Sequence, residues 1–350
     1  MMKKNIVLAL TLLVPLIFFS RGLLADDWGD DSSASAPAYP YPVPLGLSKP
    51  KVPQNNPITK EKVDLGRYLY FDKRLSRNNT ISCATCHDPA KGWTDQSPVS
   101  TGINGLKGAR SAPPVFNATY NELQFWDGRA PSLEEQAKGP IQNPVEMGFS
   151  LKGVEQKIGQ IKGYQKMFRK AFGPGPITSE RIVEAIASFE RTILSGDSDY
   201  DRFIAGNKKA LSLSAQRGMN LFFGRAHCDA CHTGPNFSDS SFHNLGVGMN
   251  AKHPDLGRYL VTKKDGDQGR FKTPGLRGLL YTHPYMHDGS EKTLEEVIDF
   301  YNKGGNPNPY LDKEIHPLGL NSQQKKDLVA FLKALNGKPV RVNIPKTFPR

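Results

Sequence analysis

Apolar residues recur at helical spacing in several stretches and predict a mostly helical chain. In "KTLEEVIDFYNKGG" a capping box of Thr293 and Glu296 begins a helix, and the glycines at 304–305 end it. A tyrosine belongs to the apolar stripe of this helix and is therefore expected to face inward. The stripe consists of Leu294, Val297, Ile298 and Tyr301.

Two further stretches carry helix signals. In "APSLEEQAKGPI" a capping-box pattern of Ser132 and Glu135 begins a short helix, and Gly139-Pro140 should end it. Another helix should follow Ser322 and stop at Gly337. Its packing face consists of Leu328, Phe331, Leu332 and Leu335.

Similar segments in the two halves of the chain indicate an internal duplication. "LGRYLYFD" and "RGMNLFFG" both place a leucine three residues and a phenylalanine five residues after a glycine. The repeat predicts two small helical domains, over residues 58–207 and 208–338. Residues 339–350 should form an extended surface tail. The matching positions are Gly66, Leu69 and Phe71, and Gly218, Leu221 and Phe223.

The N-terminal residues have the pattern of a secretory signal. Two lysines precede an apolar run over residues 6–19, and Ala25 ends a small-residue cleavage site, so residues 1–25 are predicted to be a signal peptide. A membrane anchor is the alternative reading, but the run is short for a bilayer span and contains Pro15. We expect an exported, periplasmic protein with no stable membrane span.

Residues 26–57 contain seven prolines and predict an extended linker. Removal of the signal peptide lowers the net charge from +12 to +9, so the mature protein stays basic. A basic surface favours anionic partners by electrostatic steering. Export argues against nucleic acid as that partner.

All four cysteines lie in two Cys-x-x-Cys-His motifs. Exported cysteines usually form disulfides, and a single motif of this kind could be a redox dithiol or chance. Two motifs with the histidine in register instead predict two c-type haems, each held by thioethers and by a proximal histidine. The motifs are Cys83, Cys86 and His87, and Cys228, Cys231 and His232.

Function depends on whether each iron keeps an open face. An iron with two strong protein ligands mainly passes electrons, whereas an open iron binds peroxide. No histidine lies between His87 and His227, and the rest of the first domain offers only Met147 and Met167 as methionine ligands. The first haem is therefore expected to be open unless Met147 or a residue of the other domain closes it.

Five blocks closely resemble the bacterial dihaem cytochrome c peroxidase and MauG superfamily. Their order and spacing agree with the family between residues 58 and 338. The resemblance implies a mostly α fold with two cytochrome c-like haem domains in tandem, the first peroxidatic and the second for electron transfer. The blocks are "CATCHDPAKGWTD", "FWDGRAPSLEEQAKGPIQNPVEMG", "HCDACHTGPNFSD", "TPGLRG" and "PYMHDGSEKTLEEVIDFYNKGG".

The resemblance also implies roles around the first haem. Gln136, Pro140 and Glu146 match the distal glutamine, proline and glutamate of the family, with Glu146 as the acid/base and Gln136 orienting the peroxide. Trp126 matches the tryptophan that relays electrons or holes between the haems. Taken alone, Trp126 could equally be a core aromatic, and Glu146 and Gln136 could be solvated helix-end residues.

The residue expected as the distal ligand of the second haem differs from the one in the respiratory peroxidases. Those enzymes resemble this chain but place a methionine at the position of Tyr301, whereas MauG and its relatives have tyrosine there. A phenolate lowers the iron potential and favours high oxidation states, and methionine does the opposite. Met286 is the rival ligand, and a tyrosine that binds no iron would simply be core.

Calcium is a further implication of the resemblance. Thr282 and Pro284 match the family's carbonyl ligands, but Ser111 stands where an asparagine ligand is expected. A calcium site here should therefore be weaker, more hydrated or absent.

Two enzyme functions remain open, with a non-catalytic dihaem electron carrier as the third alternative. In the first, the protein is a peroxidase that reduces hydrogen peroxide with electrons from a small cytochrome c or copper protein, which enter at the second haem. In the second, a MauG-like enzyme uses peroxide to oxidise side chains of a partner protein at a distance. Family frequency favours the first function, whereas Tyr301 favours the second.

Overall fold

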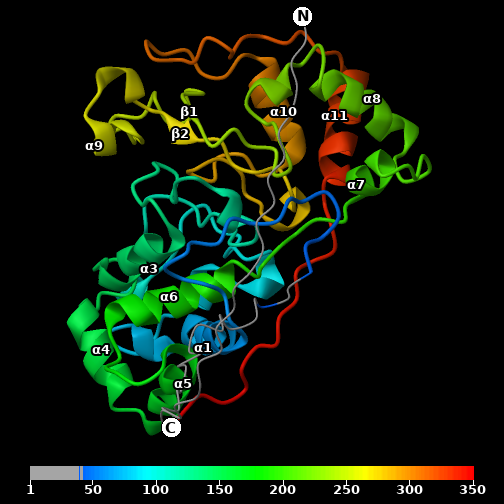
Figure 1. Ribbon diagram of the computed structural model, residues 1–350. Helices are drawn as coiled ribbons and strands as arrows, with labels where there is room; N and C mark the ends of the chain where they lie inside the picture. Colours follow the sequence, from blue (N-terminus) through cyan, green and yellow to red (C-terminus); the bar gives the residue numbers. More distant parts are fainter. Residues whose placement is uncertain (1–38, 40–41) are drawn as a thin grey trace, which may run out of the picture. The chain divides into compact units, whose positions relative to one another are not determined.

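The computed structural model describes Tyr39 and residues 42–350, which belong to one compact unit. Helices dominate this part of the chain, and its one small sheet pairs two short antiparallel strands (Figure 1). The predicted signal peptide lies outside the described residues. The helices are α1 (Lys60–Phe71), α2 (Cys83–Cys86), α3 (Leu133–Gln142), α4 (Leu151–Gly159), α5 (Lys162–Phe172), α6 (Ser179–Glu190), α7 (Asp199–Ile204), α8 (Leu213–Phe222), α9 (Tyr259–Thr262), α10 (Leu294–Asn302) and α11 (Ser322–Ala334); the strands are β1 (Phe242–His243) and β2 (Phe271–Lys272).

Buried apolar side chains form two main clusters. The first is built mainly from α1, α4, α5 and α6, and the second from α8, α10 and α11. Each cluster contains a glycine at the point where two helices cross. A methyl group on Gly66 of α1 would lie 1.8 Å from the Ala185 carbonyl oxygen of α6, and one on Gly218 of α8 would lie 1.9 Å from the Asp327 carbonyl oxygen of α11. The duplicated glycines therefore mark the same close helix crossing in both halves.

The helix signals around α10 are confirmed. The Thr293 hydroxyl accepts from the Glu296 amide at 3.1 Å, and the Glu296 carboxylate accepts from the Thr293 amide at 3.0 Å. Gly304 and Gly305 follow the helix with positive φ angles, as a glycine-rich helix end requires. Tyr301 is half-buried on the apolar side.

Two predicted helix ends are wrong. α3 continues through Pro140 to Gln142, because proline removes only its own amide donor and the Asn143 amide still bonds to the Gly139 carbonyl at 2.9 Å. α11 ends at Ala334 rather than at Gly337, which instead lies against the backbone of Gly196.

The capping box of α3 forms only in part. The Ser132 hydroxyl accepts from the Glu135 amide at 3.2 Å, but the Glu135 carboxylate binds Lys138 at 2.7 Å instead of reaching back to the N-cap.

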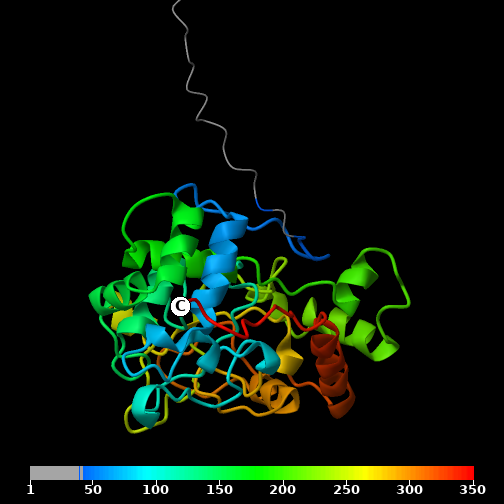
Figure 2. The same cartoon turned by 90° about the horizontal axis from the view of Figure 1, so that it is seen from below.

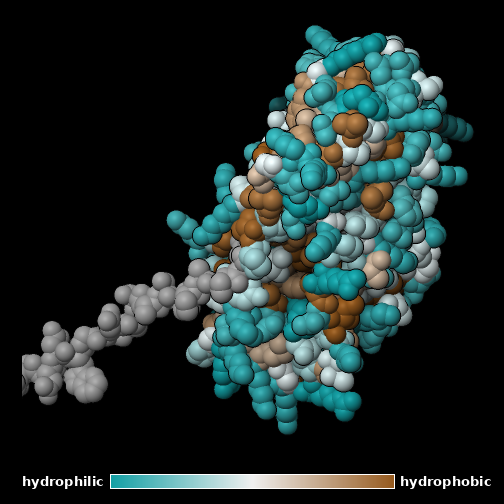
Figure 3. Space-filling view, turned by 90° about the vertical axis from the view of Figure 1, so that its right-hand side faces the viewer, coloured by the Kyte–Doolittle hydropathy of each residue, from teal (hydrophilic) through white to brown (hydrophobic). Residues whose placement is uncertain are grey.

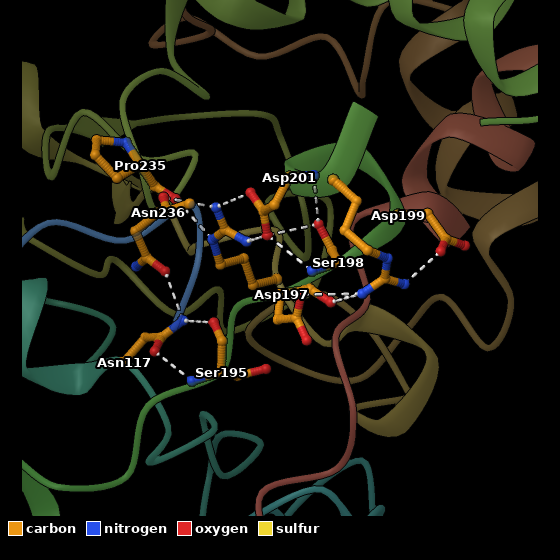
Figure 4. Close-up of polar contacts among 11 residues, drawn as sticks. Asn117, Ser195, Asp197, Ser198, Asp199, Asp201, Pro235 and Asn236 are labelled. Atoms are coloured by element: carbon orange, nitrogen blue, oxygen red, sulfur yellow. Dashed lines mark hydrogen bonds and ion pairs between the residues drawn. The ribbon is translucent and has the colours of Figure 1, made fainter. Parts of the chain in front are cut away.

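A buried ion pair ties α7 to the second half of the chain (Figure 4). The Asp201 carboxylate accepts from both terminal nitrogens of Arg277 at 2.7 and 2.9 Å, and from the Ser198 hydroxyl at 2.7 Å. Nearby, the Asn117 side chain bonds to the backbone of Ser195 in both directions at 2.8 Å. α7 also packs on α11, so this short helix contributes to the second core.

The segments at both ends of the described chain lie extended along the helices. Residues 42–57 contain no helix or strand and are held by backbone contacts, such as the hydrogen bond from the Tyr120 hydroxyl to the Ser48 carbonyl at 2.6 Å. Residues 339–350 leave α11 and run back to α1 and α5 (Figures 1 and 2). There the Trp93 indole donates to the Val340 carbonyl at 3.1 Å, and the Gly163 amide donates to the Arg350 carbonyl at 2.7 Å.

Within the described residues, none of the helices combines the length and the apolar composition that crossing a bilayer would need.

Candidate active site

A cavity of about 820 Å³ brings together most of the residues that the sequence singled out for the first haem. This volume is typical of a cofactor site. The walls come from α2, α3 and the loops around Trp126 and Glu146. The predicted site residues on these walls are Cys83, Cys86, His87, Trp126, Gln136, Pro140 and Glu146.

The first Cys-x-x-Cys-His motif forms one tight turn. α2 consists of Cys83–Cys86, and the Thr85 hydroxyl accepts from the Ser82 amide at 2.9 Å. His87 Nδ1 lies 3.3 Å from the Trp93 carbonyl oxygen. Burial lowers the pKa of His87, which keeps the imidazole neutral. With Nδ1 engaged by a carbonyl, Nε2 is the nitrogen that a haem iron would use.

The second motif repeats this arrangement. His232 Nδ1 lies 3.0 Å from the Phe237 carbonyl oxygen, and burial lowers the pKa of His232 as well. Cys228 and Cys231 carry no disulfide. Paired free thiols beside an oriented neutral imidazole fit the predicted c-type haem at both motifs.

The Glu146 carboxyl lies at the cavity wall, where its surroundings shift its pKa. Burial raises its pKa, while the Asn143 amide, which donates to it at 2.6 Å, and the nearby Arg129 oppose that rise. The sequence reasoning did not single out Asn143 or Arg129. The spacing Asn-x-x-Glu in "NPVE" is the signal that could have found Asn143.

The loop before α3 and the loop before α10 repeat each other. "QFWDGRA" and "YMHDGSE" are each closed by an isolated antiparallel bridge, Gln124 with Ala130 and Tyr285 with Glu291. Phe125 and its counterpart Met286 both have a φ of 68°. When the same alignment of the two segments is continued along the helices, Pro140 of α3 is at the position that Tyr301 has in α10.

The correspondence gives the two sites different side chains at the same helix position. Pro140 has no atom that can ligate an iron, whereas Tyr301 carries a phenol. Burial raises the pKa of that phenol above its usual range, and the nearby Cys228 and Cys231 raise it further. Tyr301 therefore lies near the second motif.

Two of the methionines that sequence analysis kept as possible ligands have described surroundings. Met147 is 2% exposed and is packed in the first apolar cluster, although it also borders the cavity. The Met286 backbone carbonyl accepts from the Ser111 hydroxyl at 3.1 Å.

Trp126 is half-buried and is tied to both halves of the chain. Its indole donates to the Ser111 carbonyl at 3.0 Å, and its own carbonyl accepts from the Lys272 amide at 2.8 Å. These bonds fix the ring at the wall of the cavity, where segments of the two predicted domains meet.

The residues suggested for calcium fit that ion poorly. The Ser111 hydroxyl is neutral and is already bonded to the Met286 carbonyl. Thr282 and Pro284 would offer only backbone or hydroxyl oxygens. Protein calcium sites usually include carboxylates, and these three residues supply none.

Two other groups of titratable residues lie near the motifs. Glu190 of α6 is 6% exposed and lines the cavity. Its Oε2 has no hydrogen-bond partner among the described residues, and burial raises the pKa of this carboxyl to about 8.

A second group lies at the second motif, where a thiol, a carboxylate and an imidazole converge closely enough to hold a metal ion. They belong to Cys231, Asp239 and His243. A haem thioether at Cys231 would use the same sulfur.

Comparisons with known proteins agree with the motifs. The family model for di-haem cytochrome c peroxidases matches residues 60–209. The methylamine utilization protein MauG of Methylorubrum extorquens is 42% identical over 297 residues, which cover 84% of this chain and 83% of that protein. The cytochrome c551 peroxidase of Pseudomonas aeruginosa is 38% identical over 302 residues, which cover 83% of each chain.

Solved structures show the same fold. The crystal structure of a MauG-like protein associated with microbial copper homeostasis matches with a TM-score of 0.79 and 34% identity, over 86% of this chain and 96% of that chain. The diheme peroxidase BthA from Burkholderia thailandensis matches with a TM-score of 0.71 and 24% identity, over 88% and 96% of the two chains, which supports the fold alone.

Proposed function

Because the chain belongs to the di-haem cytochrome c peroxidase family, to which MauG also belongs, we propose that it reduces hydrogen peroxide in the periplasm with electrons from a small redox protein. Two c-type haems are bound covalently in this proposal, one at Cys83 and Cys86 and one at Cys228 and Cys231. The two crossing helix pairs then belong to tandem cytochrome c-like domains. Each turnover combines one peroxide, two electrons and two protons into two waters.

One observation carries the proposal: Gln136, Pro140 and Glu146 line the same cavity as the first Cys-x-x-Cys-His motif. A haem with an open face supplies the iron at which the peroxide O–O bond is broken. Glu146 takes the first proton from the peroxide and returns it to the departing oxygen. Gln136 orients the peroxide by hydrogen bonding, and Pro140 leaves that face without a protein ligand.

Substitution of Glu146 tests this assignment. Glu146→Gln keeps the size of the side chain but cannot exchange the proton, so peroxide turnover should fall by roughly 10²–10⁴-fold while both haems stay attached. The matched control is Glu135→Gln on α3, whose carboxylate binds Lys138 at the surface. Unchanged turnover in Glu146→Gln would remove Glu146 from the mechanism.

Electrons are proposed to enter at the second haem and to pass by way of Trp126. The face that carries α7, α8 and α11 is mostly hydrophilic with separate apolar areas (Figure 3). On α8 and just after it, Leu213 and Phe223 are exposed, the latter to 43% and only five residues before Cys228. Exposed apolar side chains beside the motif, on a basic chain, suit brief contact with a small acidic redox protein.

A tyrosine near the second motif, at the helix position that Pro140 occupies in α3, supports MauG-like oxidation of a partner protein as the second candidate. A phenolate ligand would stabilise high oxidation states of the second iron, which suits storage of oxidising equivalents. The two functions differ in which molecule is oxidised at the expense of peroxide. A peroxidase should oxidise a reduced small cytochrome c with a stoichiometry of two per peroxide. A MauG-like enzyme should leave that cytochrome reduced and keep its oxidised state for a long time without a donor.

A further inference from the structure

Lys272 carries a buried positive charge without a counter-ion. It lies on β2, is 8% exposed, and its Nζ has no hydrogen-bond or ion-pair partner among the described residues. The Asp239 carboxylate favours the charged form of Lys272, but it already binds His243 at 3.0 Å. Burial lowers the pKa of Lys272 to about 8, as expected for an ammonium group removed from water.

Lys272 lines the cavity around the first Cys-x-x-Cys-His motif, and its lack of a partner distinguishes it from the other cations there. Arg110 binds both Asp127 and Asp255, at 2.7 and 2.6 Å, and Arg129 binds Asp127 at 3.0 Å. Lys107 also borders the cavity but is exposed to water. Lys272 is thus the cation of the cavity wall, within the described chain, that is both buried and unpaired.

A buried ammonium ion is costly unless an anion lies beside it. A haem carries two propionate carboxylates, on the side of the ring away from the vinyl groups that form the thioethers. We propose that Lys272 forms an ion pair with a propionate of the haem in the first cavity. The inference rests on the proposed binding of a haem at Cys83 and Cys86, and it does not depend on which reaction the enzyme performs.

The ion pair would also join the haem to Trp126. The Lys272 amide donates to the Trp126 carbonyl at 2.8 Å, so one residue holds the propionate with its side chain and the tryptophan with its backbone. Lys272 is then a positioning residue that fixes the first haem relative to the proposed relay, and it is not itself a catalytic group.

Resonance Raman spectroscopy of the ferric holoprotein tests the pair, because the propionate bending vibration reports hydrogen bonding to the carboxylate. Lys272→Met should shift this band of the first haem to the position of an unbonded propionate, and the potential of that haem should fall as the nearby positive charge is lost. Lys272→Arg should keep the band close to the wild-type position. Lys107→Met, at the exposed edge of the same cavity, should leave it unchanged.

Two results would overturn the pair: a wild-type propionate band in Lys272→Met, or an equal shift in the Met and Arg variants. Failure of the proposed function looks different. A protein that holds no haem at Cys83 and Cys86 would show a haem content below two per chain in the pyridine haemochrome assay, before any variant is made.

Discussion

At the scale of single residues, the proposed chemistry depends on how a few polar groups are held. Glu146 is buried enough to keep a raised pKa, and Asn143 prevents that pKa from rising further. The two histidines of the motifs are neutral because they are buried, and each is oriented by a backbone carbonyl. The protonation states of these candidate site residues are thus set by their surroundings.

Removal of Asn143 should change the pH dependence of turnover. The pKa of Glu146 in the protein lies above its ordinary value, so the ionised base is present above that raised pKa and is lost as the pH falls through it. Asn143→Ala deletes the donor that stabilises the carboxylate, which should raise the pKa and move the acidic limb of kcat/KM for peroxide to higher pH.

The control for this profile is Gln142→Ala, which changes the exposed neighbour of Asn143. Coincident acidic limbs for wild type and Asn143→Ala would show that Glu146 does not govern proton transfer.

At the scale of elements, the sequence predicted the helices better than their ends. Periodicity and capping residues located α10 and α11, since local hydrogen bonds fix where those helices begin. The same reasoning stopped α3 too early, because a proline near a helix end does not remove the hydrogen bonds made by later amides. Asn143, the partner of Glu146, was missed although its spacing of three residues is a local signal. The unpaired Glu190 was missed because tertiary packing rather than a sequence pattern brings it to the cavity.

The two glycine crossings give a stability prediction for the duplicated elements. Gly66→Ala and Gly218→Ala should each lower the free energy of unfolding by about 1–3 kcal/mol, because the new methyl group overlaps the backbone of the facing helix. Gly159→Ala at the end of α4 is the control, since nothing lies within 4 Å of the added atom. Urea unfolding followed by circular dichroism measures all three. Equal stability of all variants would contradict the close crossings.

At the scale of the whole molecule, contacts across the chain connect the predicted domains around the cavity. Arg110, in the first half, binds Asp255 in the second, and the Lys272 amide bonds to Trp126. The C-terminal tail returns from α11 to the first core, where it covers Trp93. The sequence indicated that the tail is extended. It did not indicate which residues the tail packs against, because no local sequence pattern specifies the partner of an extended segment.

Truncation after Lys338 should therefore weaken the first domain. It leaves the buried Trp93 indole without its acceptor and should cost about 1–3 kcal/mol in the free energy of unfolding. Ile344→Ala, which changes an exposed tail residue, should have little effect. Thermal or urea unfolding of the holoproteins compares them, and equal stability of the truncated and full chains would show that the tail is not a structural part of that domain.

We propose that the first iron has an open face beside Pro140 and Glu146 and that Tyr301 is the distal ligand of the second iron. Electron paramagnetic resonance of the fully oxidised protein, compared with the Tyr301→Phe variant, tests this ligand assignment. The wild type should show one high-spin and one low-spin haem without prior reduction, and only the low-spin signal should change in the variant. Two low-spin haems, with spectra that do not change on substitution of Tyr301, would contradict the claim.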